Sequence, residues 1–285
     1  MEREEDPWAR ALRGGAISET FRHAVDLIDA GEAAALRHLL AEQPHLATAR
    51  VQVEGEPYFA HPSLLEFVAE NPVRHGTLPP TIADVARAIL AAGAQADRAS
   101  IDATLGLVCS GRVSRECGVQ RDLIDLLCDY GANPDGAMIA ALGQGEFEAV
   151  QALLARGARR DLRVAAATGQ LANARRLLAE ASADDRHYAL AWAAQHGRAD
   201  VVRLLLEAGE DPDRFNPPGA HAHSTPLHQA AWAGHAETVR LLLATGARLD
   251  RRDRRWNGTP AEWAEHRGRA DVAALLRAAA GGADA

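Results

Sequence analysis

The stretch that decides the fold begins at Thr225 and reads Thr-Pro-Leu-His-Gln-Ala-Ala over 225–231, Gly-His-Ala-Glu over 234–237, Leu-Leu-Leu over 241–243 and Gly-Ala at 246–247. The Thr-Pro pair returns at 259–260, which is 34 residues later (259 − 225). A unit of this size cannot bury its own apolar face. It therefore has to be one member of a stack of similar units.

Individual residues of this stretch predict where its helices begin and end. Thr225 can cap a helix with its hydroxyl, and Pro226 suits the first helical position, where no backbone donor is needed. Gly234 ends this helix, because glycine adopts the left-handed conformation without steric cost. Glu237 places a negative charge in the first turn of the next helix, which ends at Gly246. The stretch thus predicts two consecutive helices.

The Thr-Pro-Leu-His opening and a period of about 33 residues resemble an ankyrin repeat. The resemblance implies an all-α solenoid of helix-turn-helix repeats with short β-hairpin fingers, and a His228 that bonds within and between repeats. Residues 1–16 are predicted to be a charged leader and 281–285 a tail. Between them we predict a single solenoid over 17–280 with about eight repeats, several of them irregular, at 17–47, 63–97, 103–135, 136–161, 162–183, 186–213, 225–253 and 259–279.

Net charge, apolar runs and cysteine spacing indicate which class of partner the protein binds and where in the cell it acts. The net charge of −8 argues against nucleic acid, because phosphate neutralisation needs a basic face. No apolar run reaches the ~18–20 residues that span a bilayer, and the acidic start does not resemble a secretory signal. The three cysteines show no zinc-like spacing. We therefore predict a cytoplasmic monomer without membrane contact. All 31 positive residues are arginine, which indicates a GC-rich and bacterial genome.

Two early repeats are longer than the organising one. The opening residue and the closing glycine are 21 residues apart in the organising repeat (246 − 225), 30 in the second (93 − 63) and 27 in the third (131 − 104). Both insertions fall between the two helices, at 70–81 and 110–119. Over 131–190 the spacing is instead compressed, which predicts helix pairs joined by short turns.

The two inserted loops should touch, because adjacent repeats place equivalent turns side by side, and long loops on a rigid scaffold often carry function. Their polar side chains could form a small-molecule or catalytic pocket, with a thiol activated by arginines or with arginine forks that hold a carboxylate or phosphate. The other interpretation is that the loops brace each other by salt bridges and hydrogen bonds. The residues concerned are Asn71, Arg74, His75, Arg112, Arg115, Glu116 and Cys117.

The principal functional expectation comes from the family resemblance, which implies a non-enzymatic scaffold that presents a concave face and finger tips to a protein partner. The fingers are expected around 94–103, 210–224 and 247–258. The basic and aromatic tip of the last finger favours an acidic protein partner, although its arginines could be paired with Asp250 and Asp253. Trp263 could instead close the stack. The candidate contact residues are Phe67, Trp192, Gln229, Trp232, Trp263, Arg254, Arg255 and Trp256.

No catalytic signature occurs in the chain, so we predict that it is not an enzyme and that it uses no cofactor. His221 and His223 alternate on an extended segment, and their imidazole nitrogens could hold zinc or copper. A third ligand is not evident. The prediction is therefore that the chain has no metal site and that these histidines lie at an exposed finger tip.

Overall fold

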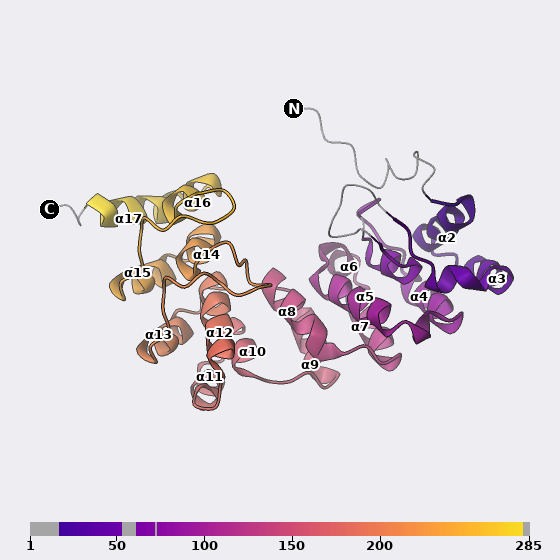
Figure 1. Cartoon of the computed structure of the whole chain (residues 1–285), viewed down its shortest axis with the longest axis horizontal. Helices are drawn as coiled ribbons and strands as arrows, with labels where there is room; N and C mark the ends of the chain where they lie inside the picture. The colour runs from indigo at the N-terminus through magenta and orange to yellow at the C-terminus, as the bar shows by residue number, and fades with distance from the viewer. Residues whose placement is uncertain (1–16, 53–60, 72, 282–285) are drawn as a thin grey trace. The chain divides into compact units, whose positions relative to one another are not determined.

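The computed structural model describes residues 17–52, 61–71 and 73–281 (Figure 1). The regular secondary structure of these ranges is helical, apart from one isolated bridge between Arg50 and Ser63. The backbone divides into two compact units, Met1–Ala158 and Arg159–Ala285, which are described separately. The predicted leader and residues 282–285 of the predicted tail lie outside the described residues.

The N-terminal unit is built of two layers of helices. In the first layer α2, η2, α5 and α8 pack in that order, and in the second layer α3, α4, α7 and α9 do the same. Short helices η1, η3 and α6 connect them. The bounds are Glu19–Ala30 (α2), Ala33–Glu42 (α3), Pro44–Thr48 (η1), Leu64–Ala69 (η2), Ile82–Ala91 (α4), Ala94–Ala96 (η3), Arg98–Ser110 (α5), Arg112–Glu116 (α6), Gln120–Asp129 (α7), Pro134–Gln144 (α8) and Phe147–Ala155 (α9).

The C-terminal unit repeats this two-layer arrangement more regularly. Helices α10, α12, α14 and α16 form the first layer, and α11, α13, α15 and α17 the second (Figure 1). Their bounds are Leu162–Ala167 (α10), Leu171–Leu178 (α11), Ala183–Gln195 (α12), Ala199–Glu207 (α13), Pro226–Ala233 (α14), Ala236–Ala244 (α15), Pro260–His266 (α16) and Ala270–Gly281 (α17). The expected helix-turn-helix solenoid is confirmed, and the short turns predicted over 131–190 are present.

The organising repeat folds as its residues predict. Pro226 occupies the first turn of α14, and Gly234 ends the helix at φ 86°, a left-handed conformation that a side chain would strain. Leu227 and Ala230 of α14 are buried in the core of the unit together with Leu242 of α15. Stacking therefore buries the apolar stripe that one repeat cannot bury alone.

The third repeat begins earlier than expected. Thr104 was predicted near its opening, but it lies inside α5, where its hydroxyl donates to the carbonyl of Ser100 at 2.7 Å. The true cap is Asp97, whose side chain accepts from the amide of Ser100 at 3.1 Å. As a result the finger expected at 94–103 is helical, and the inserted segment at 110–119 holds the short helix α6.

The expected fingers of the C-terminal unit contain no strand among the described residues. The connector 210–224 is closed by a bond from the amide of Asn216 to the carbonyl of Ser224 at 2.8 Å. Neighbouring connectors are joined by a bond from the amide of Arg254 to the carbonyl of His223, also at 2.8 Å. The fingers are thus hydrogen-bonded loops rather than regular hairpins.

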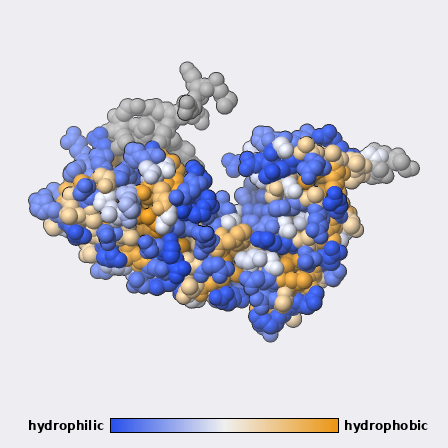
Figure 2. Space-filling model, turned by 180° about the vertical axis from the view of Figure 1, so that it is seen from behind, coloured by the Kyte–Doolittle hydropathy of each residue, from blue (hydrophilic) through white to orange (hydrophobic). Residues whose placement is uncertain are grey.

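The face shown in Figure 2 is mainly hydrophilic, with apolar side chains in small patches. Among the described residues, the large hydrophobic side chains that remain exposed are Val73, at 61%, and Trp256, at 62%. Within the same part of the chain, no helix has the length and apolar character needed to cross a membrane.

Candidate functional site

The last connector of the C-terminal unit is wound around the carboxylate of Asp253. This side chain is buried, and it accepts bonds from the amides of Arg255, Trp256 and Gly258 at 2.7–2.8 Å and from the indole of Trp263 at 3.0 Å. Asp253 also donates its own amide to the carbonyl of Gly258 at 2.9 Å. These bonds hold the connector in one conformation against α16.

The pKa of Asp253 reflects this arrangement. Burial by itself would raise the pKa, but the bonds from three backbone amides and from the Trp263 indole outweigh it, so the pKa lies below the usual 3.8. The group is therefore a carboxylate at neutral pH. As an ionised acceptor it bonds each donor more strongly than a neutral oxygen would.

Trp256 stands on this connector beside an aromatic cavity of ≈ 590 Å³. Its ring meets the ring of Trp263 at a centroid distance of 5.6 Å, and Trp263 in turn meets Trp232 at 5.7 Å. Trp232 stacks on His266 at 6.0 Å. We call Trp232, Trp256, Trp263 and His266 the aromatic face. Arg252 and Glu262 contribute a polar rim to the same cavity.

His228 contacts the aromatic face through Trp263 and is fixed by hydrogen bonds to the backbone. The amide of Thr225 donates to its Nδ1 at 3.3 Å, so the ring proton lies on Nε2, which donates to the carbonyl of Gly258 at 3.1 Å. The ring also contacts Trp263 edge-on at 5.1 Å. The expectation that His228 bonds within its repeat and to the next is confirmed.

The predicted finger-tip residues Arg254 and Arg255 are exposed, as is Trp256. The guanidinium of Arg254 lies 3.8 Å from the ring centre of Phe215, and that of Arg255 lies 5.1 Å from the ring centre of Trp256. Among the described residues, neither arginine forms an ion pair with Asp250 or Asp253. Asp250 pairs with Arg248 instead, at 2.8 Å.

Three other candidate contact residues lie inside the repeats rather than on a surface. Phe67 and Trp192 are fully buried, and Gln229 donates to the hydroxyl of Ser224 at 2.8 Å. Trp263 is 8% exposed: it closes the stack beside Asp253, and it also lines the aromatic cavity. A buried side chain offers no area to a partner, so Phe67, Trp192 and Gln229 do not enter the proposal below.

The inserted loops of the N-terminal unit meet at Cys117, whose sulfur lies 3.3 Å from the amide of Leu78 and 3.8 Å from the hydroxyl of Thr77. Their charged side chains are committed to ion pairs. Arg74 pairs with Asp29 and Glu70 at 2.6 and 3.0 Å, and His75 lies 3.2 Å from Asp29.

The remaining arginines of the second loop are also paired. Arg112 pairs with Glu116 at 2.6 Å, and Arg115 with Glu146 at 2.5 Å. Asn71 lies half-buried at the start of the first loop. These ion pairs lie within one loop or tie it to Asp29 and Glu146, and the two loops are joined to each other by the hydrogen bonds of Cys117 with Thr77 and Leu78.

His221 and His223 lie close together, with ring centroids 6.1 Å apart. Across the described ranges, no group of three or more histidine, cysteine, aspartate or glutamate side chains could hold a metal ion. His223 instead packs against Trp256 and Trp263 at 5.0 and 5.7 Å. It therefore belongs to the support of the aromatic face.

Comparison with known proteins accounts for this architecture. The model of the ankyrin repeats (3 copies) family matches residues 117–216 and 162–253. Cyclin-dependent kinase 4 inhibitor B of Bos taurus is 39% identical over an alignment of 121 residues, and the match covers 32% of this chain and 92% of the relative. The chain belongs to the ankyrin-repeat family.

Two further relatives of this ankyrin protein show the same pattern. Cyclin-dependent kinase inhibitor 2A of Homo sapiens is 41% identical over 86 residues, which are 30% of this chain and 53% of the relative. Cyclin-dependent kinase 4 inhibitor B of Rattus norvegicus is 36% identical over an alignment of 134 residues, and the match covers 45% of this chain and 99% of the relative. These relatives are mammalian, so they lend no support to a bacterial origin.

Family membership also determines the broad role of the chain. Ankyrin repeats and these inhibitors are non-enzymatic proteins that bind other proteins. The ankyrin chain is accordingly a protein-binding protein rather than an enzyme. Its partner and the surface that it uses do not follow from the comparison.

Sequence reasoning overlooked Asp253, which was considered only as a possible partner of arginines. The sequence did contain a signal. An aspartate that lies a few residues before a glycine in a short polar connector often accepts hydrogen bonds from the backbone amides that follow it. The indole of Trp263 could not have been added to that signal, because it arrives from α16.

Mild acid is expected to weaken the C-terminal unit of this ankyrin protein. Burial lowers the pKa of His228 below the usual 6.5, and it does the same for His187, His221 and His235. The unfolded chain then binds protons more readily than the folded one. The stability that these neutral rings contribute is complete above pH 6.5 and is lost as the pH falls through the folded-state pKa.

Tryptophan fluorescence in urea follows this unit, since all four tryptophans of the described residues lie in it. We expect a lower urea midpoint at about pH 5.5 than at about pH 7.5, with about 1.4 kcal/mol for each unit of pKa difference. His228→Gln should reduce the pH dependence, whereas His38→Gln, an exposed position on α3, should not. Equal midpoints at the two pH values would contradict the assignment.

Proposed function

We propose that this ankyrin protein binds its partner through the aromatic face of the C-terminal unit, with Arg252 and Arg255 beside it. The observation that carries the proposal is Trp256. It is 62% exposed, although a tryptophan is normally mostly buried, and it stands beside a cavity of ≈ 590 Å³ that is lined by further aromatic rings.

The physical chemistry of the face suits protein recognition. Tryptophan and arginine dominate the binding energy of protein interfaces, because they combine large apolar area with directional polar contacts. Asp253 holds the backbone on both sides of Trp256, so little conformational entropy is lost when a partner covers the ring. The cavity can then accept an apolar side chain of the partner between Trp232 and Trp256.

The names of the relatives supply a first candidate partner. They are inhibitors of cyclin-dependent kinases, so a kinase of that class is the partner to test first. We further propose that the protein acts in the cytoplasm as a monomer and does not bind nucleic acid. We do not propose a small-molecule or catalytic pocket at the inserted loops, because the arginines that could hold an anion there already form ion pairs.

Trp256→Ala is expected to weaken partner binding at least tenfold, because truncation of a central aromatic residue typically costs ~2 kcal/mol or more. The tagged full-length protein would be used to capture partners from native lysate with quantitative mass spectrometry. The affinity of each captured protein, and of purified cyclin-dependent kinase 4, would then be measured with purified components.

Val73→Ala is the matched control, because Val73 is equally exposed but lies in the N-terminal unit. It should change the affinity less than twofold. Both side chains are exposed, so neither substitution should alter folding, which circular dichroism would check. The proposal fails if every captured partner binds the Trp256 and Val73 variants equally well.

A further inference from the structure

The other side of the last connector faces a second cavity, which we call the arginine pocket. It has a volume of ≈ 910 Å³ and lies between the connectors 210–224 and 247–258 and the start of α12. Arg251 and Arg254 line it, whereas Arg252 and Trp256 of the same connector line the aromatic cavity. The connector therefore separates two different environments.

Two guanidinium groups gather on one aromatic ring of this pocket. The central carbons of Arg254 and Arg251 lie 3.8 and 4.7 Å from the ring centre of Phe215. Within the described residues, no carboxylate forms an ion pair with Arg214, Arg251 or Arg254. The Nε of Arg251 is buried without a hydrogen-bond acceptor. The ring positions these cations, but it does not neutralise them.

Two buried side chains in the lining each have one polar atom without a hydrogen-bond partner. The side chain of His187 is 5% exposed and that of Asn216 is 3% exposed, and both line the pocket. Neither the Nε2 of His187 nor the Oδ1 of Asn216 has a hydrogen-bond partner. A buried polar atom without a partner is costly. The Oδ1 of Asn216 is an acceptor, so a backbone amide of a bound segment would complete it, and an anion would complete the Nε2 of His187 when that ring is protonated.

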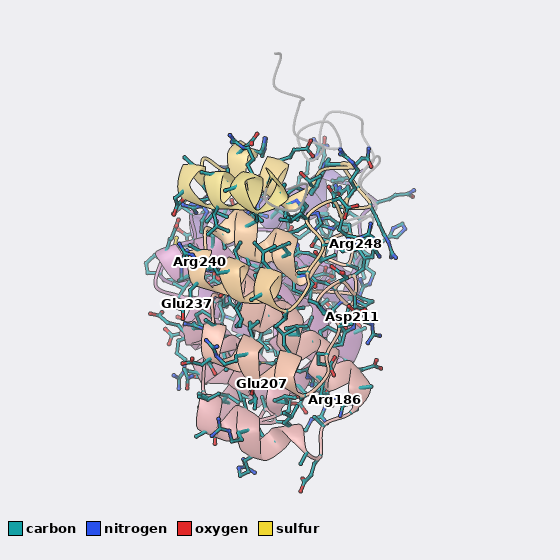
Figure 3. All side chains as sticks on the ribbon, turned by 90° about the vertical axis from the view of Figure 1, so that its left-hand side faces the viewer. Arg186, Glu207, Asp211, Glu237, Arg240 and Arg248 are labelled. Carbon is teal, nitrogen blue, oxygen red and sulfur yellow. The ribbon has the colours of Figure 1, made fainter. Side chains whose placement is uncertain are left out.

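Carboxylates are present in the lining as well, but two of them are engaged. Asp211 accepts the amide of Asp213, and Asp213 accepts the amide of Arg248, both at 2.8 Å. Figure 3 shows Asp211 and Arg248 on the same edge of the C-terminal unit. The third, Asp184, lies in the first turn of α12, where the helix dipole favours a negative charge. The cations that remain unpaired are those around Phe215.

We propose that the arginine pocket binds an acidic segment of the partner protein, with an anionic side chain held by Arg251 and Arg254. The inference rests on the proposed protein-binding function, and it adds the chemistry that a partner must offer. Guanidinium forks match carboxylate and phosphate oxygens in pairs, and the rings of Phe215 and Tyr188 give the neighbouring part of the segment an apolar wall.

Bound anions should also change His187. Burial, and then the charge of Arg214, lower the pKa of this histidine, so the ring is neutral and its Nε2 is an acceptor. An anion placed among these groups would raise that pKa and convert Nε2 into a donor. Asp184 and Glu210 act in the same direction as the anion. Binding of the acidic segment should therefore tighten as the pH falls from 7 towards 6.

The test uses the full-length protein and three fluorescent peptides of equal length: a glutamate oligomer, a glutamine oligomer that contains one phosphoserine, and an all-glutamine oligomer. Fluorescence anisotropy should show binding of one or both anionic peptides, with the stronger of them identifying carboxylate or phosphate as the natural group. The all-glutamine peptide should not bind. Salt should weaken the binding, as for any charge-assisted contact.

Arg251→Gln combined with Arg254→Gln should weaken the anionic peptides at least tenfold. Arg254→Gln alone, at an exposed position, should weaken them severalfold and guards against a folding defect in the double variant. Arg240→Gln is the matched control, because Arg240 is an exposed arginine on the opposite edge of the unit (Figure 3). The control should change the affinity less than twofold.

Two results would overturn the inference: no binding of either anionic peptide, or binding that the arginine variants leave unchanged. Equal binding of an oligouridylate would also overturn it, since the pocket would then accept any polyanion. Trp256→Ala separates the two proposals. This substitution should weaken binding of the partner and leave binding of the peptides unchanged. Failure of the peptides to bind would therefore not contradict the proposed role of the aromatic face.

Discussion

Replacement of Glu70 by alanine should lower the unfolding free energy of the N-terminal unit by about 3–5 kcal/mol, the range found when one partner of a buried ion pair is removed. The side chain of Glu70 has no exposed surface, and that of Arg74 is 3% exposed. The Oε1 of Glu70 accepts the amides of Arg74, His75 and Gly76 at 2.8, 2.5 and 2.8 Å. The substitution would leave these three amides without their shared acceptor.

Arg74 would be affected as well. Its guanidinium is shared between Glu70 and Asp29, donates to the carbonyl of Phe67 at 2.9 Å, and lies 5.1 Å from the ring centre of Phe67. Through these contacts it ties the inserted loop to α2 and to η2. Loss of one carboxylate would leave the cation half-paired in a dry environment, where an unpaired charge is most costly.

Circular dichroism in urea would measure the loss, and hydrogen exchange of the segment 61–81 would show where it occurs. Glu42→Ala on α3 is the control, because Glu42 forms an exposed pair with His38 and should cost less than 1 kcal/mol. Glu70 has a φ of 55°, so Glu70→Gly should be about 1 kcal/mol less harmful than Glu70→Ala. If Glu70→Ala cost no more than Glu42→Ala, the buried network would not hold the loop.

The second large effect is expected for Asp253→Ala, which should destabilise the C-terminal unit by about 2–4 kcal/mol, since four donors lose an ionised acceptor. The same substitution frees the backbone around Trp256. Partner binding should therefore fall even where the unit remains folded. Asp253→Asn keeps one acceptor oxygen and should lie between alanine and the natural residue in stability.

Tryptophan fluorescence in urea would follow the unfolding, and Asp250→Asn is the matched control three residues earlier. Asp250 is exposed, and among the described residues its ion-pair partner is the exposed Arg248, so its loss should leave the urea midpoint almost unchanged. Because the pKa of Asp253 lies below 3.8, its contribution is present above that pH and disappears as the pH falls through the folded-state value. Equal stability of the two variants would contradict the role given to Asp253.

Helix boundaries and the repeat architecture of this protein follow from local chemistry. Thr225, Pro226 and Gly234 act on backbone groups within one or two turns, so their effect does not depend on the rest of the chain. The hydrogen bonds of His228 within its repeat and to the next one could be predicted for a related reason, because each repeat places equivalent residues beside its neighbour. Where the period is regular, one repeat predicts the surroundings of the next.

Burial and pairing in the irregular parts depended on residues far apart in the chain. Trp192 and Trp256 were equal candidates for a partner contact, but neighbouring repeats cover the first and leave the second exposed. Arg74 was a candidate for binding a ligand, but in the structure its guanidinium donates to Asp29 of α2, which is 45 residues away in the sequence. Likewise the arginines around Phe215 come together because two successive connectors fold against each other. These contacts cannot be predicted from a local sequence pattern. An inserted loop or a finger tip does not follow the repeat period, so the period does not identify its neighbours.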